Sequence, residues 1–248
     1  MRLSIPVVLA VLAFCSAPCQ AAEPINVVVW DEQQPRQKEA YDNFLGNEIA
    51  KHLSSQPGLN VRSTNLSASG KGIADNVLDS CQVLVWWGHV RQAEITPEEG
   101  KQIVARIKRG QLSLIALHSA HWSTPFVEAM NERTRINARQ QFPAREGEKI
   151  EFTEVAPPKR YTVPGRDAPF TPRFTARKFP DNITRVTIHL PYCCFPAYRP
   201  DGKPSFLRCL IPDHPIARGL PETFSLPGTE MYDEAHHVPK PDEVVFEE

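Results

Sequence analysis

The sequence predicts a doubly wound α/β fold, in which helices cover both faces of a mostly parallel sheet. Two continuous apolar runs without polar alternation, at 25–30 (INVVVW) and 82–87 (QVLVWW), are typical of strands buried on both faces. Segments with helical spacing follow both runs, and parallel strands joined by right-handed crossovers place helices on both sides of a sheet. The length of 248 residues, with 41% hydrophobic and 23% charged residues, is sufficient for one such domain.

Helical and strand patterns alternate through the first half of the chain. They predict a helix over 36–53, a weaker strand over 59–66, a short helix over 73–78 and a helix that ends near residue 110. The start of the last helix is the clearest of these signals. Thr96 is a suitable cap, Pro97 takes the first helical position and Glu99 completes a capping box.

In the stretch at 112–123, LSLIALHSAHWS, a predicted strand is followed directly by polar side chains. Its apolar start predicts the central, buried strand of the sheet, and Ser123 opens a helix that we expect to run to about Glu132. His118 and Ser119 follow the strand without an intervening loop. The carboxyl edge of an open α/β sheet is where ligands bind, so we expect the functional site here.

The second half of the chain is predicted to be rich in loops, because 17 of the 24 prolines lie beyond residue 140. Short β-like pieces at 149–155 and 182–191 predict a β-rich insertion, or a flap laid over the sheet, with too few apolar residues for its own core. We expect 213–234 to be mostly loop. Residues 244–248 resemble part of a strand, and we expect a terminal strand and helix to be missing after them.

Residues 1–22 have the pattern of an export signal, since Arg2 precedes a short apolar run and small residues follow that run. We expect cleavage after Ala21 and a periplasmic or extracellular location; a retained N-terminal anchor and a lipid-modified Cys15 are the alternatives. No stretch of the chain reaches the length of a transmembrane helix. Residues 23–248 of the mature chain are therefore expected to form a single domain without a membrane span.

Four cysteines lie after the predicted cleavage point. An oxidising compartment would permit a disulfide from Cys193 or Cys194 to Cys209, whereas the alternative is that these three residues and Cys81 are buried thiols. The spacing of these cysteines is a poor match to a zinc site.

The charge balance argues against nucleic acid as a partner. The chain has 28 Lys and Arg residues against 29 Asp and Glu residues, so it lacks the basic footprint of a protein that binds a phosphate backbone. It also contains no GxGxxG or GxxxxGK[ST] motif, which removes the usual support for nucleotide binding.

Histidines and carboxylates follow three predicted strands. Asp31 and Glu32 follow the first strand, His89 follows the second buried run, and His118 and His121 follow the central strand. If these strands are neighbours, the side chains converge and form either an acid/base site near neutral pH or a divalent-metal site at His89 and His118. We expect His118, His89 and Asp31 to be catalytic, and Glu32 and His121 to bind the ligand.

The four tryptophans lie at or just after the ends of predicted strands, where flat apolar surface suits the C–H faces of a sugar ring. Trp86 and Trp87 must point to opposite faces of the sheet, so at most one of them reaches a pocket. We expect Trp30, Trp87 and Trp122 to contact the ligand. The alternative is that all four are packing residues.

Further candidates are weaker. Ser119 follows a strand as the serine of a nucleophile elbow does, but the flanking glycines are absent, so the strained turn of an elbow is not supported and we expect ligand binding rather than covalent chemistry. Glu230, His236 and His237 could complete the site from the far side, although a solvated loop is the favoured interpretation of the two histidines.

Several segments resemble the ThuA-like (trehalose utilisation) family. The matching pieces are INVVVWDE at 25–32, VLVWWGH at 83–89, IALHSAHWS at 115–123, FPAYRPDGKPS at 195–205, DHPIARGLP at 213–221 and MYDE at 231–234. The resemblance implies a class I glutamine amidotransferase-like fold, which is a flavodoxin-like three-layer sandwich, and a role in sugar metabolism. His118 stands where the amidotransferases have their nucleophilic cysteine, so the resemblance does not extend to glutamine hydrolysis.

Two interpretations of function remain. The first is an enzyme that acts on a trehalose-type glycoside or its oxidised derivative, with His118, His89 and Asp31 handling protons or a metal. The second is a non-catalytic carbohydrate-binding or accessory protein that uses the same pocket as a ligand platform.

Overall fold

The computed structural model describes residues 23–88, 90–158, 163–165, 167–194, 197–232 and 237–248. The predicted export signal, His89 and His236 lie outside these residues. None of the helices in the described ranges combines the length and the apolar character that a membrane crossing needs.

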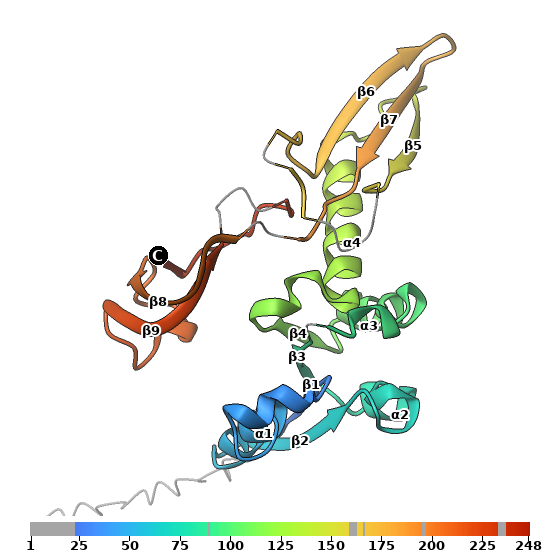
Figure 1. Cartoon of the computed structure of the whole chain (residues 1–248). Coiled ribbons are helices and arrows are strands. Elements are labelled where there is room, and N and C mark those ends of the chain that lie inside the picture. The colour runs from blue at the N-terminus through green and yellow to red at the C-terminus, as the bar shows by residue number, and fades with distance from the viewer. Residues whose placement is uncertain (1–22, 89, 159–162, 166, 195–196, 233–236) are drawn as a thin grey trace, which may run out of the picture.

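A four-stranded parallel sheet forms the centre of the first half of the chain (Figure 1). Its strands are β1 (Ile25–Asp31), β2 (Leu59–Asn65), β3 (Val83–Trp87) and β4 (Ser113–Ala116), in the order β2-β1-β3-β4. All three strand pairs are parallel. This order matches the first four strands of a flavodoxin-like sheet, so the predicted α/β sandwich is confirmed.

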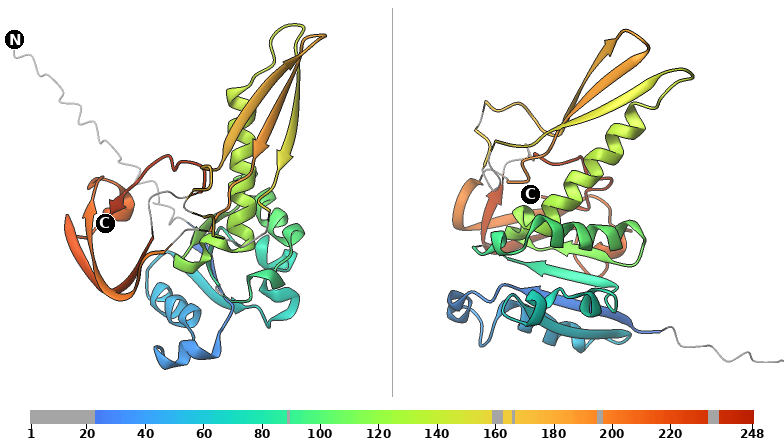
Figure 2. Two further views of the ribbon diagram at one scale, coloured as in Figure 1. Left: turned by 45° about the horizontal axis from the view of Figure 1, so that its top comes forward. Right: turned by 90° about the vertical axis from the view of Figure 1, so that its right-hand side faces the viewer.

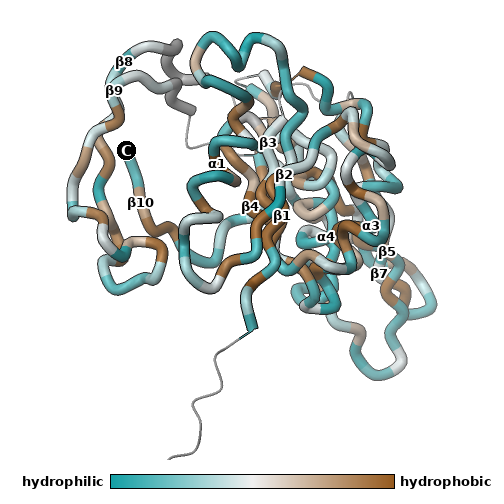
Figure 3. Tube along the Cα trace, turned by 90° about the horizontal axis from the view of Figure 1, so that it is seen from below, coloured by the Kyte–Doolittle hydropathy of each residue, from teal (hydrophilic) through white to brown (hydrophobic). Residues whose placement is uncertain are grey.

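Helices cover both faces of the sheet and make it a three-layer structure. On one face, Val27, Val29 and Val85 pack around Ala50 of α1 (Leu45–Ser54). On the other face, Trp30 and Leu84 belong to an apolar cluster that includes residues of α2 (Asp75–Leu78) and α3 (Pro97–Lys108). Figure 3 shows brown, apolar stretches of β1 and β4 between α1 and α3.

The single helix predicted over 36–53 is wrong. The chain instead forms a short 3-10 helix, η1 (Pro35–Glu39), and a separate α1. Buried side chains determine where α1 begins, because the Asp31 carboxylate accepts the Gly46 N–H at 2.7 Å and Gln37 Oε1 accepts the Leu45 N–H at 2.8 Å. In contrast, α3 begins as predicted, with a complete capping box between Thr96 and Glu99.

Strand β4 lies at the edge of the parallel sheet and is not the central, buried strand that its apolar residues predicted. Its residues alternate between exposed and half-buried, and Ile115 is 47% exposed. The reason is topological. The next strand of the chain, β5 (Lys149–Val155), pairs with β7 (Ile183–His189) in a different sheet.

Helix α4 (Thr124–Gln141) is nine residues longer than the predicted end near Glu132. Its last turns pack against the three-stranded sheet β5-β7-β6, in which β6 is Arg173–Phe179. Ala138 of α4 is buried with Val186 and Ile188 of β7. The predicted strands at 149–155 and 182–191 are therefore confirmed, but they lie beside the far end of α4 and do not cover the parallel sheet (Figures 1 and 2).

A third sheet contains β8 (Ala197–Cys209), β9 (Thr223–Tyr232) and the short β10 (Phe246–Glu247), in the order β10-β8-β9. The prediction that 213–234 is mostly loop is wrong for its second half. Three register shifts interrupt the pairing of β8 with β9, which weakens the alternation by which a strand is recognised.

The four cysteines of the described residues, Cys81, Cys193, Cys194 and Cys209, are buried free thiols. The predicted disulfide to Cys209 is therefore absent from this structure, and the alternative of four buried thiols is confirmed. Burial raises the pKa of the Cys194 thiol to about 12.

Candidate functional site

His118 lies at the turn between β4 and the 3-10 helix η4 (His118–Trp122). Its side chain is exposed and its backbone has a φ of 39°, in the left-handed region. Hydrogen bonds on either side hold the turn, from Leu117 N to the carbonyl of Trp86 at 3.0 Å and from Ala120 N to the carbonyl of Leu117 at 2.8 Å. A left-handed conformation costs an L-residue about 1–2 kcal/mol, and such conformations concentrate at functional sites.

The strained turn that sequence analysis did not support at Ser119 is therefore present, one residue earlier. It exposes an imidazole at the carboxyl edge of the sheet, in the position where the resemblance to the amidotransferases would place a nucleophilic cysteine. The side chain of Ser119 lies outside the described structure.

His121 and Trp122 follow in η4, and both are half-buried. Their rings lie nearly parallel, with centroids 6.2 Å apart and an interplanar angle of 21°. Nδ1 of His121 lies 3.0 Å from the carbonyl oxygen of Cys193, in the loop after β7. The predicted ligand-binding residues His121 and Trp122 are thus next to His118, on one short helix.

Asp31 does not open into a pocket. Its side chain is 0% exposed, and its carboxylate accepts N–H groups from the backbone of Gln33, the side chain of Gln37 and the backbone of Gly46. These bonds connect the end of β1 to the start of α1. The geometry therefore gives Asp31 a supporting role in place of the predicted direct role in catalysis.

Glu32 is also buried, at 1% exposure. Its carboxylate accepts the backbone N–H groups of Val90 at 2.8 Å and Arg91 at 3.1 Å, and the side chain of Gln34. It therefore ties the loop after β1 to the loop after β3. This bridge lies at the point between β1 and β3 where doubly wound folds usually bind ligands, and it corrects the prediction that Glu32 faces a ligand.

Trp30 is 1% exposed and stacks on Trp86, with ring centroids 3.8 Å apart and an interplanar angle of 7°. Its Nε1–H donates to the carbonyl of Lys71 at 2.8 Å. Trp30 is therefore a core residue, and the prediction that it contacts the ligand is wrong. Trp87 is half-buried, and its neighbour Trp86 is buried on the opposite face, as alternation predicted.

Some predicted site residues cannot be placed in this arrangement. His89 and His236 lie outside the described residues, and so does the side chain of Glu230. Within the part of the chain that the structure describes, no group of three or more His, Cys, Asp or Glu side chains could hold a metal ion. The predicted convergence of His89 with His118, and a metal at that pair, therefore stay predictions.

His237 does not lie in a solvated loop, which was the favoured interpretation of its sequence. It is 4% exposed, and its ring lies 5.4 Å from the ring of Tyr192 and 5.7 Å from that of Phe170. Nδ1 of His237 lies 3.3 Å from the backbone N of Thr171 and 3.1 Å from its hydroxyl. Burial lowers the pKa of His237. No local pattern in the sequence indicates that the segments around Thr171, Tyr192 and His237 come together.

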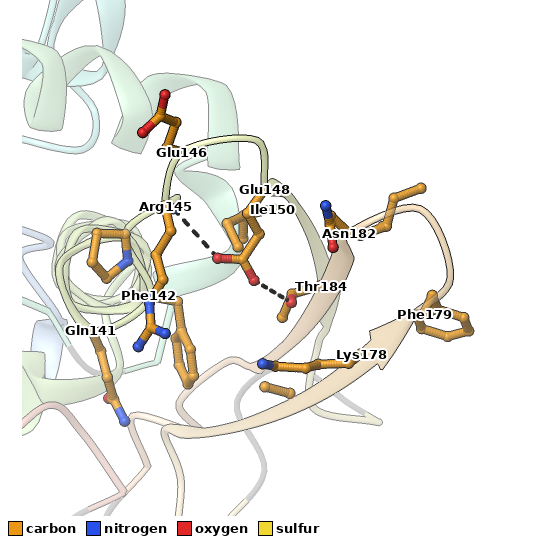
Figure 4. A pocket seen from close by; sticks show the side chains of 13 residues that line it. Gln141, Phe142, Arg145, Glu146, Glu148, Ile150, Lys178, Phe179, Asn182 and Thr184 are labelled. Atoms are coloured by element: carbon orange, nitrogen blue, oxygen red, sulfur yellow. Dashed lines mark hydrogen bonds between the residues drawn. The ribbon is translucent and has the colours of Figure 1, made fainter.

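A cavity of about 530 Å³ lies elsewhere, at the far end of α4 (Figure 4). Its lining includes the exposed Arg145 and Lys178 and the carboxylate of Glu148, which accepts the hydroxyl of Thr184 at 2.6 Å. That hydrogen bond is the main reason why the pKa of Glu148 is lowered. None of the predicted site residues lines this cavity. The 18-residue helix α4, about 27 Å long, separates it from His118.

Comparison with known proteins is consistent with the fold. The family model described as ThuA, trehalose utilisation, matches residues 26–248. A solved structure, titled as a putative ThuA-like protein from Bacteroides uniformis ATCC 8492, aligns with a TM-score of 0.50 and 13% sequence identity, over 93% of this chain and 71% of that chain. At that identity the likeness shows the fold alone. No curated protein matches the sequence.

Proposed function

Because the chain belongs to the ThuA family of trehalose utilisation, we propose that it is an enzyme acting on a trehalose-type glycoside or an oxidised derivative of one. The proposed site is the end of β4, where His118 and His121 follow the sheet. The observation that carries the proposal is the exposed imidazole of His118 on a left-handed turn, with a φ of 39°. Strain of this kind persists only where the surrounding structure holds it, and strained residues cluster at active sites.

His118 is proposed as an acid/base residue, because imidazole is the side chain that most often transfers protons in catalysis. Trp122 in η4 and Trp87 at the end of β3 are half-buried, so each has ring surface that could contact the apolar face of a sugar. Asp31 and Glu32 support the loops around the site through their buried hydrogen bonds. The turn residue is an imidazole, so the thioester chemistry of glutamine hydrolysis is not part of the proposal.

We propose in addition that residues 1–22 direct export and that the enzyme works outside the cytoplasm. Determination of the N-terminal residue of the protein recovered from a periplasmic fraction tests this part. A mature chain that begins after Ala21 would support it, and an uncleaved chain in the cytoplasm would contradict it.

The test of the activity uses trehalose and a keto derivative of trehalose as probes, with NMR detection of sugar consumption and calorimetry for binding. His118→Ala should lower turnover about 10²–10⁴-fold and change the dissociation constant only a few-fold. His52→Ala, on the exposed surface of α1, is the matched control and should keep full turnover.

The outcomes separate the two interpretations of function. A wild-type protein that binds the sugars without converting them would support the non-catalytic carbohydrate-binding alternative. A protein that neither binds nor converts either probe, or a His118→Ala variant with unchanged turnover, would refute the proposed enzyme.

A further inference from the structure

Cys193 connects two histidines that are far apart in the sequence. Its carbonyl oxygen lies 3.0 Å from Nδ1 of His121, and its N–H donates to the backbone carbonyl of His237 at 3.2 Å. Cys193 is fully buried, and its backbone has a φ of 59°. Like His118, it is a left-handed residue, and its carbonyl is directed at a ring of the candidate site.

The contact between His121 and Cys193 determines which nitrogen of His121 carries a proton. A backbone carbonyl oxygen can only accept a hydrogen bond, so Nδ1 of His121 must be the donor. In the neutral ring Nε2 is then unprotonated. A carbonyl that holds Nδ1–H in this way sets both the tautomer and the orientation of an imidazole.

The same reasoning gives His237 the opposite tautomer. The backbone N–H of Thr171 can only donate, so Nδ1 of His237 accepts and its proton is on Nε2. The Thr171 hydroxyl, which accepts the N–H of Tyr192 at 3.3 Å, directs its own proton to the same nitrogen. The His237 ring is thereby held by Thr171, and its backbone carbonyl in turn holds Cys193.

We propose, on the basis of the proposed function, that His121 is the proton-accepting residue of the site and that Cys193 and His237 are its positioning residues. In hydrolysis of the glycosidic bond, Nε2 of His121 takes one proton from the attacking water, whose oxygen forms a bond to the anomeric carbon while the bond from that carbon to the glycosidic oxygen breaks. The resulting imidazolium is stabilised by its Nδ1–H bond to the Cys193 carbonyl. Protonated His118 gives a proton to the leaving glycosidic oxygen, and the proton on His121 then passes through solvent to His118, which restores both residues.

The first experiment measures tautomers directly. Long-range ¹H–¹⁵N spectra of the uniformly labelled full chain at pH 8 should show His121 with a protonated Nδ1 and His237 with a protonated Nε2. The signals are assigned by the loss of one spin system in His121→Gln and another in His237→Gln. A His121 ring with its proton on Nε2 would overturn the proposal, whatever the activity of the protein.

The second experiment changes the backbone conformation at Cys193, and with it the position of the carbonyl that contacts His121. Cys193→Gly accepts a φ of 59° without strain and keeps the carbonyl, so it should keep the His121 tautomer. Cys193→Pro holds φ near −65° and removes the N–H that binds His237. Relative to Cys193→Gly, the proline variant should lose the defined tautomer and lower kcat about 10²-fold or more, with KM changed only a few-fold. An equal kcat in the two folded variants would contradict the proposed positioning.

A milder pair covers the case in which the proline variant does not fold. Thr171→Val removes the hydroxyl that anchors His237, whereas Thr171→Ser keeps it, so only the valine variant should broaden the His121 signals and lower kcat. Failure of the two proposals can be told apart. A correct His121 tautomer in a protein without turnover refutes the proposed enzyme and the proton transfer together, whereas turnover with the wrong tautomer refutes only the inference about His121.

Discussion

Replacement of His118 by glycine should give a more stable protein than replacement by alanine. Both changes remove the imidazole, so the comparison isolates the backbone. At a φ of 39° an L-residue is strained, whereas glycine adopts the left-handed region without a steric penalty. The comparison therefore tests the turn on which the candidate site depends, independently of any substrate.

The expected magnitude follows from two opposing contributions. Relief of the left-handed strain favours glycine by about 1–2 kcal/mol, and the greater freedom of glycine in the unfolded chain opposes it by about 0.4–1 kcal/mol. The net difference in the free energy of unfolding lies between about 0 and 1.6 kcal/mol, with a centre of about 0.8 kcal/mol, in favour of His118→Gly. In a chain of this length, this corresponds to a rise in Tm of about 2–3 °C relative to His118→Ala.

Urea unfolding followed by circular dichroism is the assay, with equal m-values required for the two variants. His52 in α1 provides the matched control, because glycine in a helix is less stable than alanine by about 0.5–1 kcal/mol. The sign of the glycine–alanine difference should therefore reverse between the two positions. If alanine is the more stable replacement at both positions, His118 is not in a left-handed turn and the reasoning for the site fails.

Two further predictions concern the structure around the site. Gly46→Ala should lower the free energy of unfolding by about 1–3 kcal/mol, because the added Cβ would lie 2.5 Å from Cβ of Asp31. Gly165→Ala is the control: a Cβ at that position meets no atom within 4 Å, so the free energy of unfolding should change by less than about 0.5 kcal/mol. Equal effects of the two substitutions would contradict the close contact between Gly46 and Asp31. The lowered pKa of His237 means that the folded protein binds fewer protons than the unfolded chain, so its contribution to stability is complete above about pH 6.5 and is lost as the pH falls through the folded pKa. Urea unfolding from pH 8 to pH 5 should therefore show that the advantage of the parent protein over His237→Gln shrinks on acidification, and a constant difference would show that the ring titrates normally.

The strands that could be predicted are those with a strong local pattern. The apolar runs that became β1 and β3 have no polar alternation, and both are buried in the parallel sheet. The start of α3 was predicted to the residue, because a capping box involves only Thr96 and its near neighbours. Each of these features depends on side chains within a few positions of one another.

The failures arise where distant segments determine local structure. Apolar spacing over 36–53 indicated one helix, but the carboxylate of Asp31 binds Gly46 N and begins α1 there. The apolar residues of β4 indicated a central strand, yet β4 lies at the edge because β5 pairs with β7. Helix α4 is longer than predicted because its last turns pack against β7, which follows about fifty residues later.

By itself, the sequence determined which segments form the parallel sheet and that Trp86 and Trp87 lie on opposite faces of it. It also determined that the polar side chains of His118 and His121 follow β4. These are local properties, since strand alternation and capping depend on neighbouring residues. Only the tertiary structure decided that the carboxylates of Asp31 and Glu32 are buried and accept N–H hydrogen bonds. It also decided that Nδ1 of His121 contacts the carbonyl oxygen of Cys193, 72 residues away in the chain. Burial and hydrogen-bond partners depend on segments that come together only in the folded chain, so no local pattern could specify them.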